Sequence, residues 1–558
     1  MWVDDATRPP GAHRFSVNVR NGIVRPGSLY DSTLGTGLAG AGAVMPNGIY
    51  SYRTPQGCHY KIALRGTTDP RVSVVQGSRV IFSGQLVSSA PRATTTTYHA
   101  NVNAQSAQVP VTWGRIGNKV VFCGPLEGKI GVVEFHRSGR PEFRLARAYD
   151  RTILDQRFNA ADDVGPYRRS PPYAVSLAVH EGRVVVVGQD GTCYFSNAND
   201  VDAYPYNNLF YLQDGMGSER TTSLASVSEG RLVVSQRDGI WDIEGALSAI
   251  ATTTVAKRTM YGRGVVAPAS VQVVANGVMM ALSEAGPFMW VSGTYIPASG
   301  ALSDGVGPVG ALFNRSHIDD LDIDRYRPLA SGLAGAISRY SKRLQVYEVA
   351  IGALVDDGDE IEDRRVRLRY HLPTKQWNLE VHPVTRALLA ANDSGNDEVL
   401  MRSDDAGRLY YEGVGDVEQT GTGTESLISA RLQAGFVDMT PERARPRRVW
   451  ISMHRDWASA VHVAVLPDRR SSNAEQTVNA TAETRDRAFG SSAGGDGFVL
   501  GTDVLESDQT ITHRRGLPPL AAGRRVRFEF QTASAAPVGT RWGLASAQLE
   551  VAGGGRVP

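Results

Sequence analysis

Two acidic clusters contain the residue types that could bind a metal ion. The first is Asp319, Asp320, Asp322 and Asp324 after His317, and the second is Asp356, Asp357, Asp359 and Glu360 around Gly358. Calcium-binding loops need an ordered series of oxygen ligands that a Glu closes. Neither cluster has that spacing. We interpret the first as a solvated helix start or loop and the second as a hairpin turn, and we predict no metal site and no cofactor.

The sequence lacks the motifs that mark several classes of enzyme. The eleven histidines are scattered, and neither HExxH nor a P-loop occurs, which argues against a zinc hydrolase and a nucleotide hydrolase. Sialidases carry repeated Ser-x-Asp-x-Gly-x-x-Trp turns, whereas the nearest sequence here is Arg237-Asp238-Gly239 followed by Trp241. A glycosidase needs only two carboxylates at a set separation, which depends on the fold. We predict no catalytic residues and no enzyme.

The cysteines do not form a framework. Cys58, Cys123 and Cys193 lie far apart, with no CxxC pair and no even number to pair into disulfides. Structural zinc and a disulfide scaffold are therefore not expected. We predict that all three are buried free thiols.

Arginines are concentrated in two runs near the end of the chain. These runs comprise Arg443, Arg445, Arg447 and Arg448, and then Arg514, Arg515, Arg524 and Arg525. They could contact phosphate, but arginine that alternates along a strand is more typical of a solvated or salt-bridged surface, or of an intersubunit contact. The whole chain has 59 Lys and Arg against 57 Asp and Glu, so it lacks the charge excess of a general nucleic-acid-binding protein.

Composition indicates a large β-protein. The chain has 558 residues, of which 59 are glycine and 28 are proline. A single core rarely grows past roughly 250–300 residues, so several domains or a repeat array are expected. Abundant glycine and proline suit many short strands that tight turns join. The first residues lack a signal peptide, and no apolar run reaches about 18 residues, so we expect no membrane span.

An internal repeat sets the predicted architecture. Residues 179–191 (VHEGRVVVVGQDG) and 227–239 (VSEGRLVVSQRDG) match at eight of thirteen positions with an offset of 48, and 274–286 (VANGVMMALSEAG) is a weaker copy. Each copy has a tight turn at Gly182, Gly230 or Gly277, a short apolar strand and a second turn before another strand. A period of this size fits four short strands, which is one blade of a β-propeller.

Related segments extend the array on both sides. They lie at 74–84, 116–124, 340–349, 365–381 and 407–416. In the fourth of these, Val366, Leu368 and Tyr370 alternate with three arginines, which indicates a half-buried strand. We predict an all-β fold with a propeller of about six blades over residues 50–420, after an N-terminal extension of residues 1–50. A β-sandwich array is the alternative.

The last part of the chain differs from the repeats. Residues 421–558 are expected to form an additional antiparallel β-domain with a flexible loop at about 470–498. Near the end, Val526, Phe528 and Phe530 alternate with charged residues, which indicates a strand with one wet face. Helix is expected only within 316–344, with Ser316 as its cap.

The segment 182–245 resembles the propeller of tail nozzle, tail hub or stabilisation proteins of short-tailed bacteriophages. The resemblance rests on Phe195-Ser196-Asn197, the following NDVDAY, the Asp214-Gly215 turn and GRLVV before Ile240-Trp241. TKQWNLE at 374–380 and LISARLQAGFVDM, followed by an Arg-rich turn, fit as well. It covers residues 50–450, and its motifs are turn-and-strand patterns, not catalytic signatures.

The resemblance implies structural work in a virion, after assembly in the host cytoplasm. Family members form a ring, usually a hexamer, below the tail adaptor; they retain DNA, pass the double-stranded DNA at ejection and dock fibre or spike proteins. The alternatives are a propeller-type carbohydrate-active enzyme and a carbohydrate- or protein-binding propeller. An enzyme would need a convergent cluster of Asp, Glu, Arg or His at the propeller axis, with perturbed pKa values.

Overall fold

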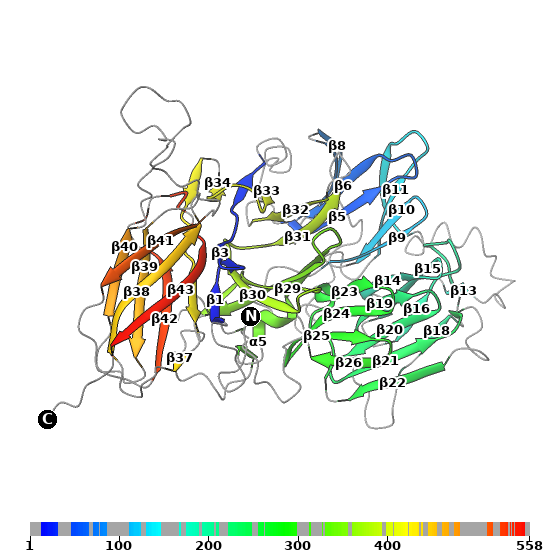
Figure 1. Ribbon diagram of the computed structural model, residues 1–558. Helices are drawn as coiled ribbons and strands as arrows, with labels where there is room; N and C mark the ends of the chain where they lie inside the picture. Colours follow the sequence, from blue (N-terminus) through cyan, green and yellow to red (C-terminus); the bar gives the residue numbers. More distant parts are fainter. Residues whose placement is uncertain are drawn as a thin grey trace, which may run out of the picture. The chain divides into compact units, whose positions relative to one another are not determined.

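The computed structural model is built almost wholly from β-strands (Figure 1). It describes residues 13–552 apart from internal gaps, of which the longest are 32–45, 86–110, 147–166, 213–220, 298–311, 314–325, 480–509 and 517–524. The chain divides into two compact units. The propeller unit comprises Tyr30–Gln376 and His382–Glu412, and the terminal unit comprises Met1–Leu29, Trp377–Val381 and Gly413–Pro558.

Seven sheets follow one another in the propeller unit. The first four are β5 (Pro46–Arg53), β6 (His59–Arg65), β7 (Arg71–Gln76) and β8 (Arg79–Gln85); β9 (Thr112–Ile116), β10 (Lys119–Cys123), β11 (Gly131–Phe135) and β12 (Pro141–Leu145); β14 (Ala174–His180), β15 (Arg183–Gly188), β16 (Cys193–Phe195) and β18 (Leu209–Phe210); and β19 (Thr221–Ser228), β20 (Arg231–Gln236), β21 (Gly239–Glu244) and β22 (Val255–Tyr261). The last three are β23 (Gln272–Ala275), β24 (Val278–Ser283), β25 (Gly286–Val291) and β26 (Thr294–Pro297); β27 (Ile337–Ser341), β28 (Val346–Leu354) and β29 (Glu360–His371); and β31 (Ala387–Asn392), β32 (Glu398–Ser403) and β33 (Leu409–Glu412). A short pair, β13 (Tyr167–Arg168) with β17 (Tyr204–Pro205), lies outside these sheets.

Hydrophobic clusters join each sheet to the next and close the ring. Val121 of β10 packs in one cluster with Val184 and Val186 of β15, and Met401 of β32 packs with Ile49 of β5, which links the seventh sheet to the first. The predicted propeller is therefore confirmed. The repeat-like segments are distributed over seven sheets around the axis, with 340–349 and 365–381 together in the sixth, close to the predicted number of about six.

The repeat turns have the equivalent geometry that the sequence alignment predicts. Gly182 and Gly230, between the first two strands of their sheets, both have φ +69°, and Gly277 has φ +72°. Glycine adopts positive φ without the steric cost that a Cβ imposes, which explains why each copy has glycine there. Asp238-Gly239 leads into β21 as expected, whereas Asp190-Gly191 lies outside the described residues.

Trp241 is buried between two neighbouring sheets, as predicted. Only 8% of it is exposed, and it packs in a cluster with Val185 and Phe195 of the preceding sheet. Its indole Nε1 donates a hydrogen bond to Gln236 Oε1 at 2.9 Å. The side chain therefore fills the inter-sheet space and has its one polar group satisfied.

The terminal unit contains the additional antiparallel β-domain. Its strands are β1 (His13–Val17), β2 (Val19–Arg20), β3 (Ile23–Val24), β4 (Ser28–Tyr30), β30 (Gln376–Val381), β34 (Glu418–Gly421), β35 (Thr424–Ser426), β36 (Arg431–Ala434), β37 (Val437–Asp438), β38 (Arg445–His454), β39 (Ala460–Pro467), β40 (Ala474–Asn479), β41 (Thr510–Gly516), β42 (Arg525–Thr532) and β43 (Leu544–Ala552). One sheet has the order β30-β1-β36-β42-β39-β40, and a second has β41-β38-β43. β1 pairs in parallel with β30 and antiparallel with β36, so residues from the start of the chain complete this sheet.

Four expectations need correction. Residues 474–479 of the expected loop form β40, a polar strand at the edge of its sheet, where it pairs on one side only. Glu529, expected on a wet face, is 9% exposed because it pairs with Arg431 at 2.5 Å. The expected helix over 316–344 is limited in the described residues to α5 (Ala330–Ala334), and 337–341 are strand. Cys58 is exposed in a turn, whereas Cys123 and Cys193 are buried.

Candidate functional site

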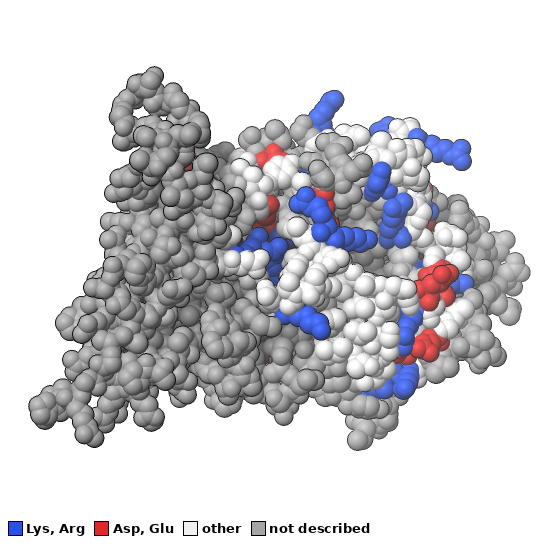
Figure 2. Space-filling model, in the orientation of Figure 1, with Lys and Arg blue, Asp and Glu red and all other residues white. Residues whose placement is uncertain are grey.

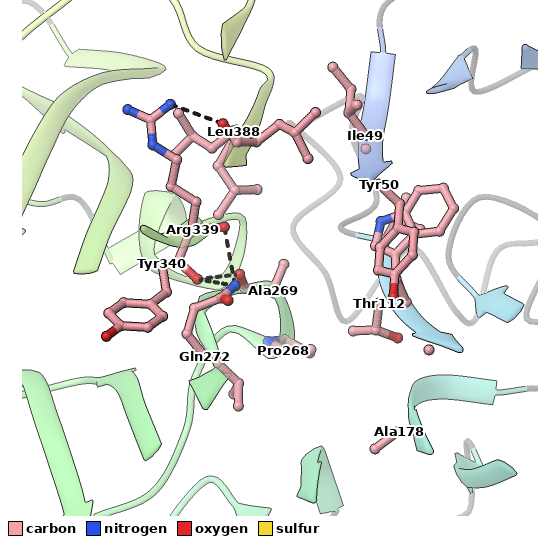
Figure 3. A pocket seen from close by; sticks show the side chains of 18 of the residues that line it. Ile49, Tyr50, Thr112, Ala178, Pro268, Ala269, Gln272, Arg339, Tyr340 and Leu388 are labelled. Carbon is pink, nitrogen blue, oxygen red and sulfur yellow. Dashed lines mark hydrogen bonds between the residues drawn. The ribbon is translucent and has the colours of Figure 1, made fainter. Parts of the chain in front are cut away.

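The innermost strands of all seven sheets surround a cavity of about 550 Å³ on the propeller axis (Figure 3). Each strand contributes two to four residues, because alternate side chains and the backbone of a strand face the axis. The charged groups on its wall are Arg115, Arg339 and Arg386, and no carboxylate lines it in the part of the chain that the structure describes. The cavity is large enough for a small molecule.

Polar side chains on the wall form bonds from one inner strand to the next. Thr112 Oγ1 of β9 accepts the backbone N–H of Leu177 in β14 at 3.0 Å. Farther round the ring, Gln272 Nε2 of β23 donates to Ser338 Oγ of β27 at 3.1 Å, and Ser338 donates in turn to the carbonyl of Ala269 at 2.9 Å (Figure 3). These groups are satisfied by neighbouring sheets and need no ligand.

A histidine and a serine meet beside the cavity. His180 Nδ1, at the end of β14, lies 2.8 Å from Oγ of Ser226 in β19. Burial lowers the pKa of His180, although Glu181 opposes the shift, so the ring is neutral. Its Nε2 is buried without a partner. An unfilled acceptor is less unfavourable than an unpaired N–H, so we place the proton on Nδ1, where it donates to Ser226.

That tautomer does not activate the serine. A general base must accept the proton of the nucleophile, and here Nδ1 already carries a proton. A catalytic triad would also need a group that orients the second ring nitrogen, and Nε2 has none. The pair therefore joins the third sheet to the fourth, as the other polar contacts do for their sheets.

The strongest electrostatic feature is a buried cluster behind Arg339. The Arg339 guanidinium contacts the carboxylates of Glu348 in β28 and Glu412 in β33. Arg367 of β29 reaches Glu412 at 2.5 Å, and Arg402 of β32 lies 3.6 Å from it. All of these side chains are at most 5% exposed. We call these five residues the arginine–glutamate clamp.

Neighbouring groups complete the clamp. Arg367 Nη2 donates to Oγ1 of Thr385 at 2.8 Å, and the Arg402 guanidinium lies over the ring of Tyr410 at 4.1 Å. Arg339 Nη1 also donates to the carbonyl of Met401 at 2.8 Å. Charged groups remain stable in the interior only when paired and hydrogen-bonded in this way.

The clamp has perturbed pKa values, but not those of a catalytic acid. Burial by itself raises the pKa of Glu412, yet the guanidinium groups of Arg339 and Arg367 outweigh burial and hold that pKa well below its usual range. Burial likewise lowers the pKa of Arg367, and Glu412 opposes this shift. A carboxylate that stays ionised and inaccessible does not exchange protons with a substrate near neutral pH. The clamp therefore joins the sixth sheet to the seventh.

Sequence reasoning did not identify the clamp. Val366, Leu368 and Tyr370 are buried as predicted, but Arg367, expected to lie on the opposite wet face, is 1% exposed. The expectation was wrong because the seventh sheet covers the arginine face of this strand and supplies Glu412. The usable signal was an Arg in β27, a Glu in β28 and an Arg in β29, which pair across adjacent strands as Arg339 with Glu348 and Arg369 with Glu348.

The other candidate residues add no site. The first acidic cluster lies outside the described residues: His317, Asp319, Asp320, Asp322 and Asp324. In the second cluster, Asp356, Asp357 and Asp359 also lie outside them. The paired strands β28 and β29 flank these three residues, and Glu360 begins β29. Of the arginine runs, the described backbone places Arg445, Arg447 and Arg448 in β38, Arg514 and Arg515 in β41 and Arg525 in β42, whereas Arg443 and Arg524 are outside. The described residues contain no group of His, Cys, Asp and Glu suited to a metal ion. Within them, every helix is too short or too polar to cross a membrane.

Comparisons with known proteins add little beyond this geometry. No family model matches the sequence, and no curated protein matches it. Among solved structures, the chain is similar to the computationally designed Ika8 protein, with 10% identity over 67% of this chain and 97% of that chain and a TM-score of 0.33. It is also similar to BBS1N from a complex with ARL6DN, with 12% identity over 70% of this chain and 97% of that chain and a TM-score of 0.38.

Proposed function

We propose that the protein is a structural component of a bacteriophage short tail, a nozzle or hub subunit that forms the distal channel below the adaptor. The sequence resemblance of residues 182–245 to that family supports this function. In this proposal, a ring of copies, most simply six, retains the DNA, passes it at ejection and presents docking surfaces for fibres or spikes.

The observation that carries the proposal is that polar side chains around the axis bond to neighbouring sheets. An enzyme or a binding protein would direct such groups into the cavity. Here Thr112, Ser226, Ser338 and Arg339 bond to the neighbouring sheet instead. Such cross-links stiffen the ring of sheets, which suits a subunit that carries mechanical load.

The cavity wall also disfavours the carbohydrate-active alternative. Glycoside hydrolysis in most families needs two carboxyl groups that face the substrate. Glu348 and Glu412 contact the wall residue Arg339, and both carboxylates are buried in ion pairs with it. The cavity is also too small for a double helix, so in this proposal the DNA passes between subunits at the centre of the ring.

The test is the position of the chain in an assembled particle. We expect cryo-electron microscopy of virions that carry this chain to resolve a closed ring of it at the distal end of the tail. Particles assembled without it should package DNA and then release it. Absence of the chain from purified virions, or glycan turnover by the purified protein that survives removal of contaminants, would refute the proposal.

A further inference from the structure

One face of the propeller unit contains two sectors of opposite charge. The turns between first and second strands, and those between third and fourth strands where consecutive strands form a hairpin, lie on the same face, because the inner strands all run in one direction. Figure 2 shows that Lys and Arg outnumber Asp and Glu among the described residues on the side that it presents. The residues of each sector come from the turns of particular sheets.

The basic sector belongs to the first and second sheets. It consists of Arg53 at the end of β5, Arg79 after the β7–β8 turn, Arg115 near the end of β9, and Arg137 and Arg140 in the β11–β12 turn. All five are exposed, and no ion pair with a carboxylate is formed by any of them in the described part of the chain. The nearby Glu142 pairs with His136 at 2.8 Å.

An aromatic stack holds these turns together. Tyr52 packs on Phe135 with ring centroids 4.4 Å apart, and Tyr60 packs on Phe135 at 4.8 Å. The Arg115 guanidinium lies over the Tyr52 ring at 4.9 Å. Because Arg53 adjoins Tyr52 and Arg137 closely follows Phe135, the stack brings arginines from two sheets into one sector. Several exposed like charges in fixed positions favour a partner of opposite charge.

The acidic sector belongs to the adjacent third and fourth sheets. Glu181 and Glu229 occupy equivalent turns and are exposed, and Asp200 lies beside the first of them because the Asn199 N–H donates to the Gly182 carbonyl at 2.6 Å. Glu181 Oε2 accepts the N–H of Leu247 at 3.2 Å, which joins the Glu181 turn to the segment after β21 in the fourth sheet. The arginines of this sector are engaged: Arg183 donates to the Ser196 carbonyl, and Arg231 pairs with Asp242 and Glu244.

We infer that the basic sector of one copy docks on the acidic sector of a second copy. The inference goes beyond the proposed function, because it concerns the pairing of two copies of the chain. Since the two sectors lie side by side on one face, two copies placed face to face can form both contacts at once, which makes a two-fold contact. Guanidinium groups suit it because their planar fork binds carboxylates in a bidentate manner.

Charge reversal tests this contact in solution. The full chain is compared by sedimentation velocity with R137E/R140E, with E181K/E229K, and with the control R237E/R263E, whose sites lie in turns on the opposite face. We expect wild-type chain at low ionic strength to associate, and added salt to reverse the association. Either sector variant should weaken association about tenfold or more, the control should match wild type, and an equimolar mixture of the two sector variants should associate again.

The mixture distinguishes a lost contact from a misfolded variant, because only folded variants can associate again when they are mixed. The inference is wrong if wild type stays monomeric at low salt, if sector variants associate like wild type, or if the mixture stays monomeric. It is also wrong if a labelled DNA duplex binds wild type, fails to bind R137E/R140E, and self-association is unchanged, since the basic sector then serves nucleic acid. The virion experiment separately tests the proposed function, so a chain found in tail rings with neutral charge reversals would overturn the contact alone.

Discussion

At the scale of single residues, the arginine–glutamate clamp is a buried group of charges that joins two sheets. Glu412 contacts Arg339 and Arg367 in a region closed to water. A buried ion pair adds little relative to apolar residues of the same shape, but removal of one member leaves an uncompensated charge. The clamp is therefore more informative about specificity of sheet pairing than about total stability.

Glu412→Gln should lower the free energy of unfolding by about 3–5 kcal/mol, because it leaves the clamp arginines without that carboxylate. Urea denaturation measures the change, and Glu142→Gln, at an exposed surface pair, should change it by less than about 1 kcal/mol.

The pKa of Glu412 is lower in the folded chain than its ordinary value, so its ionised carboxylate stabilises the folded state. This stabilisation is complete above the ordinary carboxyl pKa of 4.5 and is lost as pH falls below it. E412Q should lose less stability than wild type over that acidic range, and equal losses would contradict the assignment.

His180 should make stability sensitive to mild acid. Its pKa is lowered by burial from 6.5, so the unfolded chain binds the proton more readily than the folded chain does. The contribution is complete above about pH 6.5 and declines as pH falls below that value. In His180→Asn, thermal unfolding should depend less on pH over this range than it does in wild type. A steeper dependence in H180N would rule out the neutral buried histidine.

At the scale of the elements, glycine is needed for different reasons at different turns. A Cβ on Gly264, which precedes β23, would lie 1.8 Å from the carbonyl oxygen of Gln236. Backbone atoms cannot move aside as a flexible side chain can. Gly117, between β9 and β10, has φ +59° but open space around it.

Gly264→Ala should therefore prevent stable folding or lower the melting temperature by many degrees, whereas Gly117→Ala should cost about 1–2 kcal/mol from its left-handed backbone alone. Circular dichroism melts of the two variants provide the comparison. Similar losses for both would mean that the close approach of the Gly264 loop to the β20–β21 turn is incorrect.

Trp241→Ala should destabilise the protein by about 3–5 kcal/mol, because it opens a large void between the third and fourth sheets. The matched substitution is Trp113→Ala, whose side chain is only partly buried beside the cavity and stacks on Tyr50 at 5.5 Å. It should cost less. If denaturant titration finds Trp241→Ala to be tolerated, the repeat alignment between residues 179–191 and 227–239 loses its structural basis.

At the scale of the whole molecule, both ends of the chain build the terminal unit. β1 lies between β30 and β36, and Arg25 is buried there, where it pairs with Glu418 at 2.8 Å and bonds to Asn18. Deletion of residues 1–29 should therefore speed amide hydrogen exchange in 377–381 and 431–434, with the first five propeller sheets unchanged. Unchanged protection after this deletion would mean that β1 is dispensable.

The local patterns of the chain were enough to predict much of this architecture. Turn glycines at Gly182 and Gly230, the apolar runs after them and the spacing of 48 residues depend on the backbone and on burial within one hairpin, and such local preferences are readable in sequence. The same reasoning placed Trp241 in an inter-sheet core and found Phe528 and Phe530 on the buried face of a late strand.

Tertiary structure decided what depends on contacts between distant segments. Arg367 alternates with apolar residues just as a solvated arginine would, and only the approach of β33 with Glu412 buries it. Likewise, nothing local to residues 13–17 specifies a strand between β30 and β36, and nothing in Ser226 identifies its contact with His180. Alternation along a strand distinguishes its two faces, but it does not determine what covers each face; packing of the sheets around the axis decides that.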